Sequence, residues 1–305
     1  MSEKSLPSWR DGATRDVIMS FFDRVDEIPP NERVAVFDND GTMWSEKPDY
    51  TQIEFWLLEL HHTIAENPDL AEMPEFAAVL GGDKVAMQEL GLESLATAFL
   101  DLFVGITPQE FDARVANFFA GQAHPERGVH YRQTRYQPML ELMDELRKRG
   151  FDFYIVSAGG AEFVRVIGED FYGVAPEGVV GSQIDYEFTR DDEGKPKLVR
   201  TNHLVASGPN EGEAKVPNIQ RILGRAQSVA GGNSPGDAQM LEWAMAYDGP
   251  SLALLVSHDD AEREYDYTSV AGTFAADETI IDAATRLGWT VVSIKHDWST
   301  VFADS

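Results

Sequence analysis

Two aspartates, Asp38 and Asp40, follow a short apolar segment in the stretch RVAVFDNDGTMW and precede Gly41. Carboxylates in this arrangement can serve as a nucleophile, a proton donor or ligands of a hard metal ion. Gly41 permits a positive φ and therefore a tight turn. An EF-hand loop is excluded, because its obligatory Gly and Glu positions hold Met43 and Asp49. The segment by itself is also compatible with solvated carboxylates at the end of a strand.

Two further segments place polar groups after or beside predicted strands. In FYIVSAGG, the hydroxyl of Ser157 and the N–H groups of Ala158 and Gly159 could bind an anion where a strand meets a helix. In AKVPNIQRIL, Lys215 opens a predicted helix close to acidic residues. Each feature has an ordinary structural alternative, which is a Ser-Gly turn in the first segment and a solvated lysine in the second.

The stretch GGNSPGD follows another predicted strand and offers Asn233 and Asp237 as oxygen ligands. Its glycine spacing resembles a phosphate-binding P-loop only loosely. Because Asp237 rather than Lys follows Gly236, a P-loop is excluded. A plain Gly-rich turn is the structural alternative here.

The elements that must position these residues form an alternating pattern. Six apolar segments predict strands, and helix-period segments separate most of them. This alternation favours an α/β fold with an open, Rossmann-like parallel sheet and helices on both faces. The predicted strands are Arg33–Asp38, Phe151–Ser157, Gly178–Ser182, Gln227–Gly231, Ser251–Ser257 and Thr290–Lys295. Ligands of such sheets bind beyond the carboxyl ends of the strands, where the polar residues described above are expected.

A helical segment interrupts this alternation. Residues 48–135 include a helical region at Lys84–Val104 and a helix start at Thr107, with almost no strand signal. We therefore expect an inserted helical cap domain at residues 48–135, and a core domain formed by residues 1–47 and 136–305. Within the core sequence, helix-period residues predict helices at Gly12–Val25 and Pro138–Gly150. A hairpin that turns at DDEGK is also expected there.

The composition excludes several classes of function. The chain has 305 residues, with 52 acidic and 25 basic side chains and a formal net charge of -27. This excess repels nucleic acids and anionic membranes, so neither is expected as a partner. The absence of cysteine excludes disulfides and thiol catalysis. No segment has the pattern of a membrane span or a signal peptide, so a cytoplasmic protein is expected. The sequence does not indicate an oligomeric state.

The order of the polar segments resembles the haloacid dehalogenase (HAD) superfamily, on its phosphatase side. DNDGT matches the first motif of the family, Asp-x-Asp-x-Thr; VSAGG matches the second, Lys215 the third and GNSPGD the fourth. The stretch YQPMLELMDELRKRGFDFYIVSAGG is also similar to a bacterial subgroup described as phosphoserine-phosphatase-like. The resemblance covers most of the chain and implies a HAD-like core with a cap domain.

The resemblance implies a Mg²⁺-dependent hydrolase that acts on small phosphate monoesters. Asp38 would be the nucleophile that becomes an aspartyl-phosphate, Asp40 would be the acid and then the base, and Lys215 would offset negative charge. The implied ligands of Mg²⁺ are the Asp38 carboxylate, the Asp40 main-chain carbonyl, Asn233 and Asp237. The implied phosphate-binding residues are Thr42, Ser157, Ala158 and Gly159.

One position departs from the family pattern. Asn233 stands where the fourth motif usually has an acid, so either Asn233 or Asp237 could contact the metal ion directly. The same Asp38 chemistry would serve a phosphotransferase or a phosphomutase. The neutral Asn233 is also compatible with a metal- or phosphate-binding module that does not turn over. The natural substrate is not indicated.

Other residues could line the proposed site. Candidates near the expected start of the cap are Trp44, Glu46, Tyr50 and Trp56, although Trp56 is more typical of a cap core. After the fifth predicted strand, His258, Asp259 and Asp260 could face the site, and Arg263 and Glu264 could form an ion pair.

Overall fold

The computed structural model describes residues 5–205 and 208–303. The chain divides into two compact units, which we call the core unit and the inserted unit. The core unit consists of Met1–Pro48, Gln122–Ser182 and Pro209–Ser305, and the inserted unit of Asp49–Gly121 and Gln183–Gly208.

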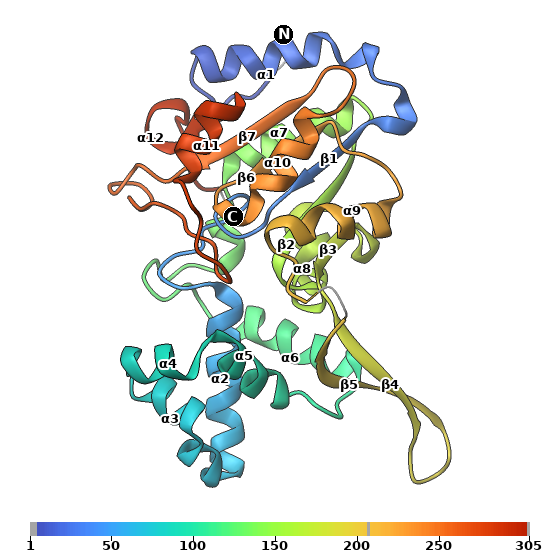
Figure 1. Cartoon of the computed structure of the whole chain (residues 1–305), viewed down its shortest axis with the longest axis vertical. Coiled ribbons are helices and arrows are strands. Elements are labelled where there is room, and N and C mark those ends of the chain that lie inside the picture. The colour runs from blue at the N-terminus through green and yellow to red at the C-terminus, as the bar shows by residue number, and fades with distance from the viewer. Residues whose placement is uncertain (1–4, 206–207, 304–305) are drawn as a thin grey trace. The chain divides into compact units, whose positions relative to one another are not determined.

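The core unit is built on a six-stranded parallel sheet with the strand order β3-β2-β1-β6-β7-β8 (Figure 1). Its strands are β1 (Val34–Phe37), β2 (Asp152–Gly160), β3 (Val179–Ser182), β6 (Val229–Gly232), β7 (Leu252–Ser257) and β8 (Thr290–Ser293). All six predicted strands are confirmed. Most bounds differ by one or two residues, and the largest difference is in β2, which continues past Ser157 to Gly160. Strand β8 ends at Ser293, before the predicted Lys295, because helix α12 (Ile294–Asp297) begins there.

Helices cover both faces of this sheet. The core helices are α1 (Ala13–Asp23), α7 (Gln137–Lys148), α8 (Ala161–Tyr172), α9 (Lys215–Leu223), α10 (Ala238–Met245), α11 (Ile280–Leu287) and the short α12. On one face, Val36 belongs to a buried cluster with Ile219 of α9 and Met240 of α10. On the other, Phe37 stacks on Phe153 at 4.8 Å. Strand β1 is therefore apolar throughout because both of its faces are buried.

Helix α7 shows how the sequence pattern produces a core helix. Its buried residues recur at helical spacing, at Pro138, Met139, Leu142, Met143 and Leu146. Arg147 and Lys148 lie in the last turn, where positive charge favours a helix end. Gly150 follows with a φ of 80°, a conformation that glycine adopts without strain. The helix predicted between Pro138 and Gly150 is confirmed.

The sheet register brings the carboxyl ends of three strands together. Phe37 at the end of β1 is paired with Ile155 of β2 on one side and with Gly231 of β6 on the other. A Cβ atom on Gly231 would lie 2.4 Å from the Phe37 ring, so only glycine permits this approach. The segments after β1, β2 and β6 consequently leave the sheet side by side.

The inserted unit contains helices and one β-hairpin. Its elements are α2 (Thr51–Glu66), α3 (Pro74–Leu80), α4 (Lys84–Leu90), α5 (Leu92–Asp101), α6 (Pro108–Gly121), β4 (Ile184–Arg190) and β5 (Pro196–Leu204). At the start of α6, the Thr107 hydroxyl accepts from the N–H of Glu110, whose carboxylate accepts from the N–H of Thr107. Trp56 stacks on Phe99 at 5.4 Å beside a buried cluster, as expected for a core residue of this unit.

The observed division differs from the expected domain boundaries in two places. The hairpin groups with the inserted unit, because β5 exchanges main-chain hydrogen bonds with Gly105 and Ile106 through Arg200. Residues 122–135 group with the core unit, because Thr134 accepts from the N–H of Ser45 and the His124 ring contacts the carbonyl of Lys47. A role of the inserted unit as a cap stays a prediction.

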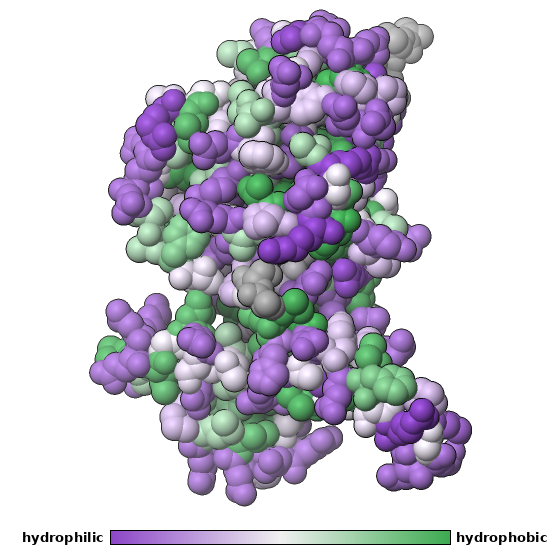
Figure 2. Space-filling model, turned by 45° about the vertical axis from the view of Figure 1, so that its right-hand side comes forward, coloured by the Kyte–Doolittle hydropathy of each residue, from purple (hydrophilic) through white to green (hydrophobic). Residues whose placement is uncertain are grey.

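The surface matches the composition. The face shown in Figure 2 is mostly hydrophilic, with hydrophobic side chains in small groups. Such a surface agrees with the many charged residues of the chain, 52 acidic and 25 basic. Among the described residues, no helix combines the length and the apolar character needed to cross a membrane.

Candidate active site

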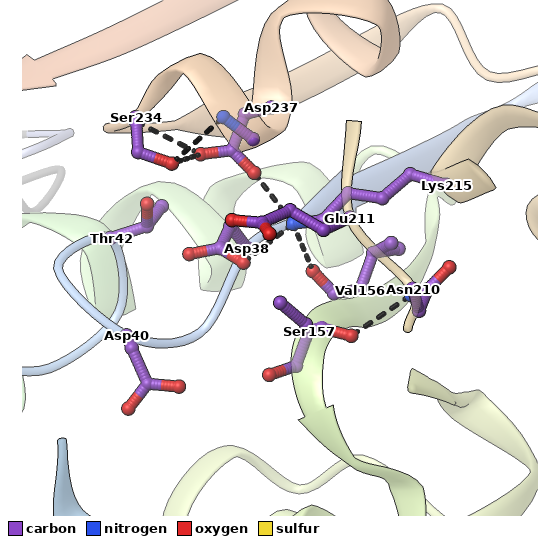
Figure 3. A network of polar contacts seen from close by, with 12 residues as sticks. Asp38, Asp40, Thr42, Val156, Ser157, Asn210, Glu211, Lys215, Ser234 and Asp237 are labelled. Atoms are coloured by element: carbon purple, nitrogen blue, oxygen red, sulfur yellow. Dashed lines mark hydrogen bonds and ion pairs between the residues drawn. The ribbon is translucent and has the colours of Figure 1, made fainter. Parts of the chain in front are cut away.

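A buried lysine joins two of the predicted catalytic segments. The ammonium of Lys215 lies 2.7 Å from Asp38 Oδ1, 2.6 Å from Asp237 Oδ1 and 3.0 Å from the carbonyl oxygen of Val156 (Figure 3). Lys215 is only 1% exposed. An ammonium has three hydrogens to donate, and the three oxygens accept all of them. The structure therefore brings together Asp38, Lys215 and Asp237, which the sequence places far apart.

Negative charge is in excess around this lysine. Burial raises the pKa of Asp38 well above its usual range, and the neighbouring Asp237 raises it further, against the opposing effect of Lys215. Burial acts to lower the pKa of Lys215, but Asp237 and Asp38 outweigh burial, and the net shift is upward. Two buried carboxylates thus share one ammonium, an arrangement that favours an additional cation.

Helix starts hold Lys215 and Asp237 in place. Lys215 is the first residue of α9, after a 3₁₀ turn at Gly212–Ala214. Asp237 ends a second 3₁₀ turn directly before α10, and its Oδ2 accepts from the N–H groups of Asn233 and Ser234, each at 3.0 Å. Both carboxylate oxygens of Asp237 are consequently engaged by protein donors.

Asp40 is held by a separate contact. Strand β1 ends at Phe37, and a turn begins at Asn39, whose carbonyl accepts from the N–H of Met43 at 2.8 Å. The alternation of an extended strand therefore does not set the direction of Asp40. Trp44 Nε1 donates to Asp40 Oδ1 at 2.9 Å. Burial raises the pKa of Asp40 to about 6, although the bond from Trp44 opposes this shift. In Figure 3, Asp40 lies apart from the Lys215 contacts.

Asn233 and Thr42 lie against the same turn. The Thr42 hydroxyl donates to Asn233 Oδ1 at 3.4 Å, and Asn233 Nδ2 donates to Ser269 Oγ at 3.1 Å. A Cβ atom at position 41 would lie 1.9 Å from Asn233 Nδ2, and Gly41 has a φ of 72°. Gly41 is therefore required both by the turn and by the close approach of Asn233.

The second-motif residues adopt a local hydrogen-bonded arrangement. Ser157 is buried, and its hydroxyl oxygen accepts from the N–H of Gly159 at 3.0 Å. The carbonyl of Ala158 accepts from Ser182 Oγ at 2.7 Å. The hydroxyl hydrogen of Ser157 remains a donor that could meet a phosphate oxygen. The N–H of Gly159 would have to leave the Ser157 hydroxyl oxygen before it could donate to a phosphate oxygen.

The donor set is compatible with Mg²⁺, which prefers oxygen ligands. Asp38 Oδ1 accepts one hydrogen bond from Lys215 and keeps a second lone pair that a metal ion could use, and among the described contacts none involves Asp38 Oδ2. Asn233 Oδ1 and the main-chain carbonyl of Asp40 are further oxygen donors. Asp237 is better suited to orienting Lys215 than to direct metal contact, because both of its oxygens are engaged. Within the described ranges, no group of three or more His, Cys, Asp or Glu side chains could hold a metal ion. An ion here would depend on mixed carboxylate, amide and main-chain oxygens.

Sequence reasoning missed Asn210, which connects the strand ends. Asn210 is fully buried, and its Nδ2 donates to the carbonyls of Ser157 at 2.9 Å and Val180 at 3.2 Å. Its Oδ1 accepts from Asn218 of α9, the helix that begins with Lys215. Asn210 follows Pro209, so the local sequence is typical of a loop and carries no signal of this role.

The residues after β7 separate into two groups. Asp260 pairs with Arg263 at 2.6 Å, and Asp259 accepts from Ser293 Oγ. The prediction that Arg263 pairs with Glu264 is therefore wrong, because the partner of Arg263 is Asp260. His258 instead contacts Glu264 and the turn after β1.

The fold and these contacts define an α/β core with its polar residues at the carboxyl ends of parallel strands. A comparison with protein families identifies the chain more narrowly, since residues 35–242 match haloacid dehalogenase-like hydrolase. The chain belongs to this family. The resemblance seen in the four motifs is thus confirmed.

Several solved structures are similar to this chain. A protein with unknown function from Bordetella pertussis Tohama I has 17% identity and a TM-score of 0.51, and the match covers 86% of this chain and 98% of that one. A functionally unknown protein from Anaerococcus prevotii DSM 20548 has 17% identity, coverage of 81% and 85%, and a TM-score of 0.47. A phosphoserine phosphohydrolase-like protein from Francisella tularensis has 18% identity, coverage of 83% and 99%, and a TM-score of 0.39. Of these three, the Bordetella structure supports the shared fold.

A comparison with curated proteins gives no significant match.

Proposed function

We propose that the chain is a Mg²⁺-dependent phosphomonoester hydrolase that acts on a small phosphorylated molecule through an aspartyl-phosphate at Asp38. The main support for this proposal is the position of Lys215. This buried lysine donates to both Asp38 and Asp237, and Asp38 directly follows the carboxyl end of the central strand β1. Membership of the hydrolase family supports the reaction class.

Asp38 has the geometry of a nucleophile. Lys215 occupies its Oδ1, which leaves Oδ2 to attack phosphorus. A carboxylate that approaches a phosphate meets like charge, at a cost of about 4 kcal/mol per unit pair at 4 Å and an effective dielectric constant of 20. Lys215 offsets part of this repulsion. A Mg²⁺ ion held by Asp38, the Asp40 carbonyl and Asn233 would supply further positive charge.

Asp40 is proposed to transfer the protons. As the Asp38–phosphorus bond forms and the ester bond breaks, Asp40 gives a proton to the leaving alkoxide. Water then attacks phosphorus, Asp40 takes its proton, and Asp38 is released as a carboxylate. The indole of Trp44 orients Asp40 for both steps. A side chain with a pKa of about 6 can hold or release a proton near neutral pH.

A panel of phosphate esters tests this function directly. With Mg²⁺, at least one ester should release inorganic phosphate, and EDTA should stop the release. If phosphate appears on an added alcohol instead of in water, the chain is a phosphotransferase. Phosphate binding by calorimetry without release from any ester would contradict the hydrolase and favour the binding module.

Replacing Asp40 should separate the two half-reactions. With an alkyl phosphate, Asp40→Asn should lower kcat about 10²- to 10⁴-fold, because the poor leaving group needs a proton. With p-nitrophenyl phosphate, whose leaving group needs no proton, rapid-mixing absorbance should show a burst of about one equivalent of nitrophenolate. The burst follows from a phosphoryl-enzyme that forms but hydrolyses slowly. Equal loss on both substrates with no burst would contradict the role of Asp40.

A further inference from the structure

A buried histidine lies beneath the turn that carries the proposed catalytic aspartates. His258 follows β7, and its side chain has no exposed surface. Its Nε2 lies 2.9 Å from the carbonyl oxygen of Gly41, and its Nδ1 lies 3.0 Å from Glu264 Oε2. The ring of Tyr267 stacks on the imidazole at 4.4 Å. Neither His258 nor Glu264 belongs to the four motifs.

Glu264 contacts the Nδ1 side of the His258 ring, opposite the side that meets the turn. Three other groups donate to the Glu264 carboxylate: Ser45 Oγ at 3.0 Å, Tyr136 Oη at 2.9 Å and the N–H of Tyr265 at 2.7 Å. Hydrogen bonds in this number favour the ionised form of the Glu264 carboxylate, which lies 3.0 Å from Nδ1 of the ring. The Gly41 carbonyl can only accept, so Nε2 is the ring atom placed to donate to it. The imidazole ring therefore bridges Glu264 and the turn.

Gly41 is the residue by which this contact reaches the catalytic segment. It directly follows Asp40, and its N–H donates to the carbonyl of Trp44, the residue that binds the Asp40 carboxylate. His258 binds the carbonyl of the same glycine from the side of β7. Without His258 the buried Gly41 carbonyl would lose this hydrogen bond. A buried carbonyl without a partner destabilises the segment that carries it, so the loss would affect the turn and not only the packing around the ring.

We propose that His258, oriented by Glu264, is a positioning residue that fixes the turn from Asp38 to Thr42 for catalysis. The inference rests on the proposed function for its kinetic consequence, although the ordering of the turn can be measured without any substrate. In the described contacts the ring touches neither Asp38 nor Asp40. Its Nε2 lies 2.9 Å from the main-chain carbonyl of Gly41 and 3.4 Å from Nδ2 of Asn233, so the shorter contact of His258 is to the turn.

The matched control is His124, a second buried histidine whose ring contacts a main-chain carbonyl. His124 is 3% exposed, and its Nε2 lies 2.7 Å from the carbonyl of Lys47, outside the Asp38–Thr42 turn. Its Nδ1 accepts from the N–H of Arg127. His124→Ala therefore removes a ring of equal size and a similar hydrogen bond without disturbing Gly41.

The experiment measures steady-state kinetics and amide hydrogen exchange on the full chain with both alanine variants. His258→Ala should lower kcat about 100-fold with KM changed less than about threefold, since displacement of a catalytic group by about 1 Å costs this much. Exchange at Gly41–Trp44 should accelerate, because the N–H groups of Gly41 and Met43 are bonded within this turn. His124→Ala should leave both readouts at the wild-type level.

Conservative variants keep the test decisive if His258→Ala does not fold. His258→Gln retains a donor for Gly41 and should recover kcat to within about tenfold of wild type, whereas Glu264→Gln should weaken the orientation of the ring. Unchanged exchange at Gly41–Trp44 in His258→Ala would overturn the proposal, and if that variant does not fold, unchanged exchange in Glu264→Gln would do so. So would equal kcat losses in the His258 and His124 variants. If the wild-type chain releases no phosphate, the proposed function fails, and accelerated exchange alone still decides whether His258 orders the turn.

Discussion

Asp38→Asn should abolish phosphate release, with kcat reduced at least about 10⁴-fold, because the amide cannot form the acyl phosphate. Lys215 would still have the carbonyl oxygen of the new amide as an acceptor, so the binding of substrate should persist. The measurement is phosphate release with Mg²⁺ on the best ester of the panel, together with phosphate affinity by calorimetry. Residual activity above about 1% of wild type would contradict the nucleophilic role of Asp38.

The same substitution should not destabilise the fold. Asp38 and Asp237 share one ammonium, and burial together with the negative charge of Asp237 raises the pKa of Asp38. Removing one of the two buried charges relieves their repulsion, so the Tm of Asp38→Asn without metal should equal or exceed that of wild type. Asp152→Asn, at a half-exposed pair with Arg225, provides a comparison in which Tm should hardly change.

Lys215→Met should have the opposite effect on stability. The substitution leaves Asp38 and Asp237 buried without their shared cation, and removing one partner of a buried ion pair typically costs about 3–5 kcal/mol. Urea unfolding with EDTA should therefore show a large fall in the midpoint. Phosphate release should be lost as well, because the charge that offsets the Asp38–phosphate repulsion is absent.

Two comparisons test that explanation of the Lys215 result. In the double variant Lys215→Met with Asp237→Asn, one of the two uncompensated charges is gone, so about half of the lost stability or more should return. Lys148→Met removes an exposed pair with Glu145 at 2.8 Å and should cost less than about 1 kcal/mol. If Lys148→Met lowers the free energy of unfolding as much as Lys215→Met does, the buried ion pairs of Lys215 do not explain its loss of stability.

The sheet and the four motif positions were predictable because they depend on local patterns. Buried parallel strands require apolar runs such as Val34–Phe37, and the chain must leave such a strand at its carboxyl end, where Asp38 stands. The order of motifs then identified the family. These patterns fix which residues lie near the strand ends, but they do not fix the direction of each side chain.

What could not be predicted depends on contacts between distant residues. Asn210 and His258 contact the main-chain carbonyls of Ser157 and Gly41. Every residue has such a carbonyl, so these contacts cannot be recognised from the residue types. The direction of Asp40 depends on where β1 ends, and strand ends are the least certain part of a sequence pattern. The grouping of the hairpin with the inserted unit depends on its pairing with the chain near Gly105.

The contact between Lys215 and Asp38 joins residues separated by 177 positions in the chain. Such a contact forms only after a long loop has closed, and loop closure is a slow part of folding. Asp237, in contrast, is only 22 positions from Lys215 and can meet it early. During synthesis, Asp38 emerges long before either partner exists. We therefore expect the lysine–aspartate pair of Lys215 and Asp237 to be able to form before the proposed nucleophile joins it.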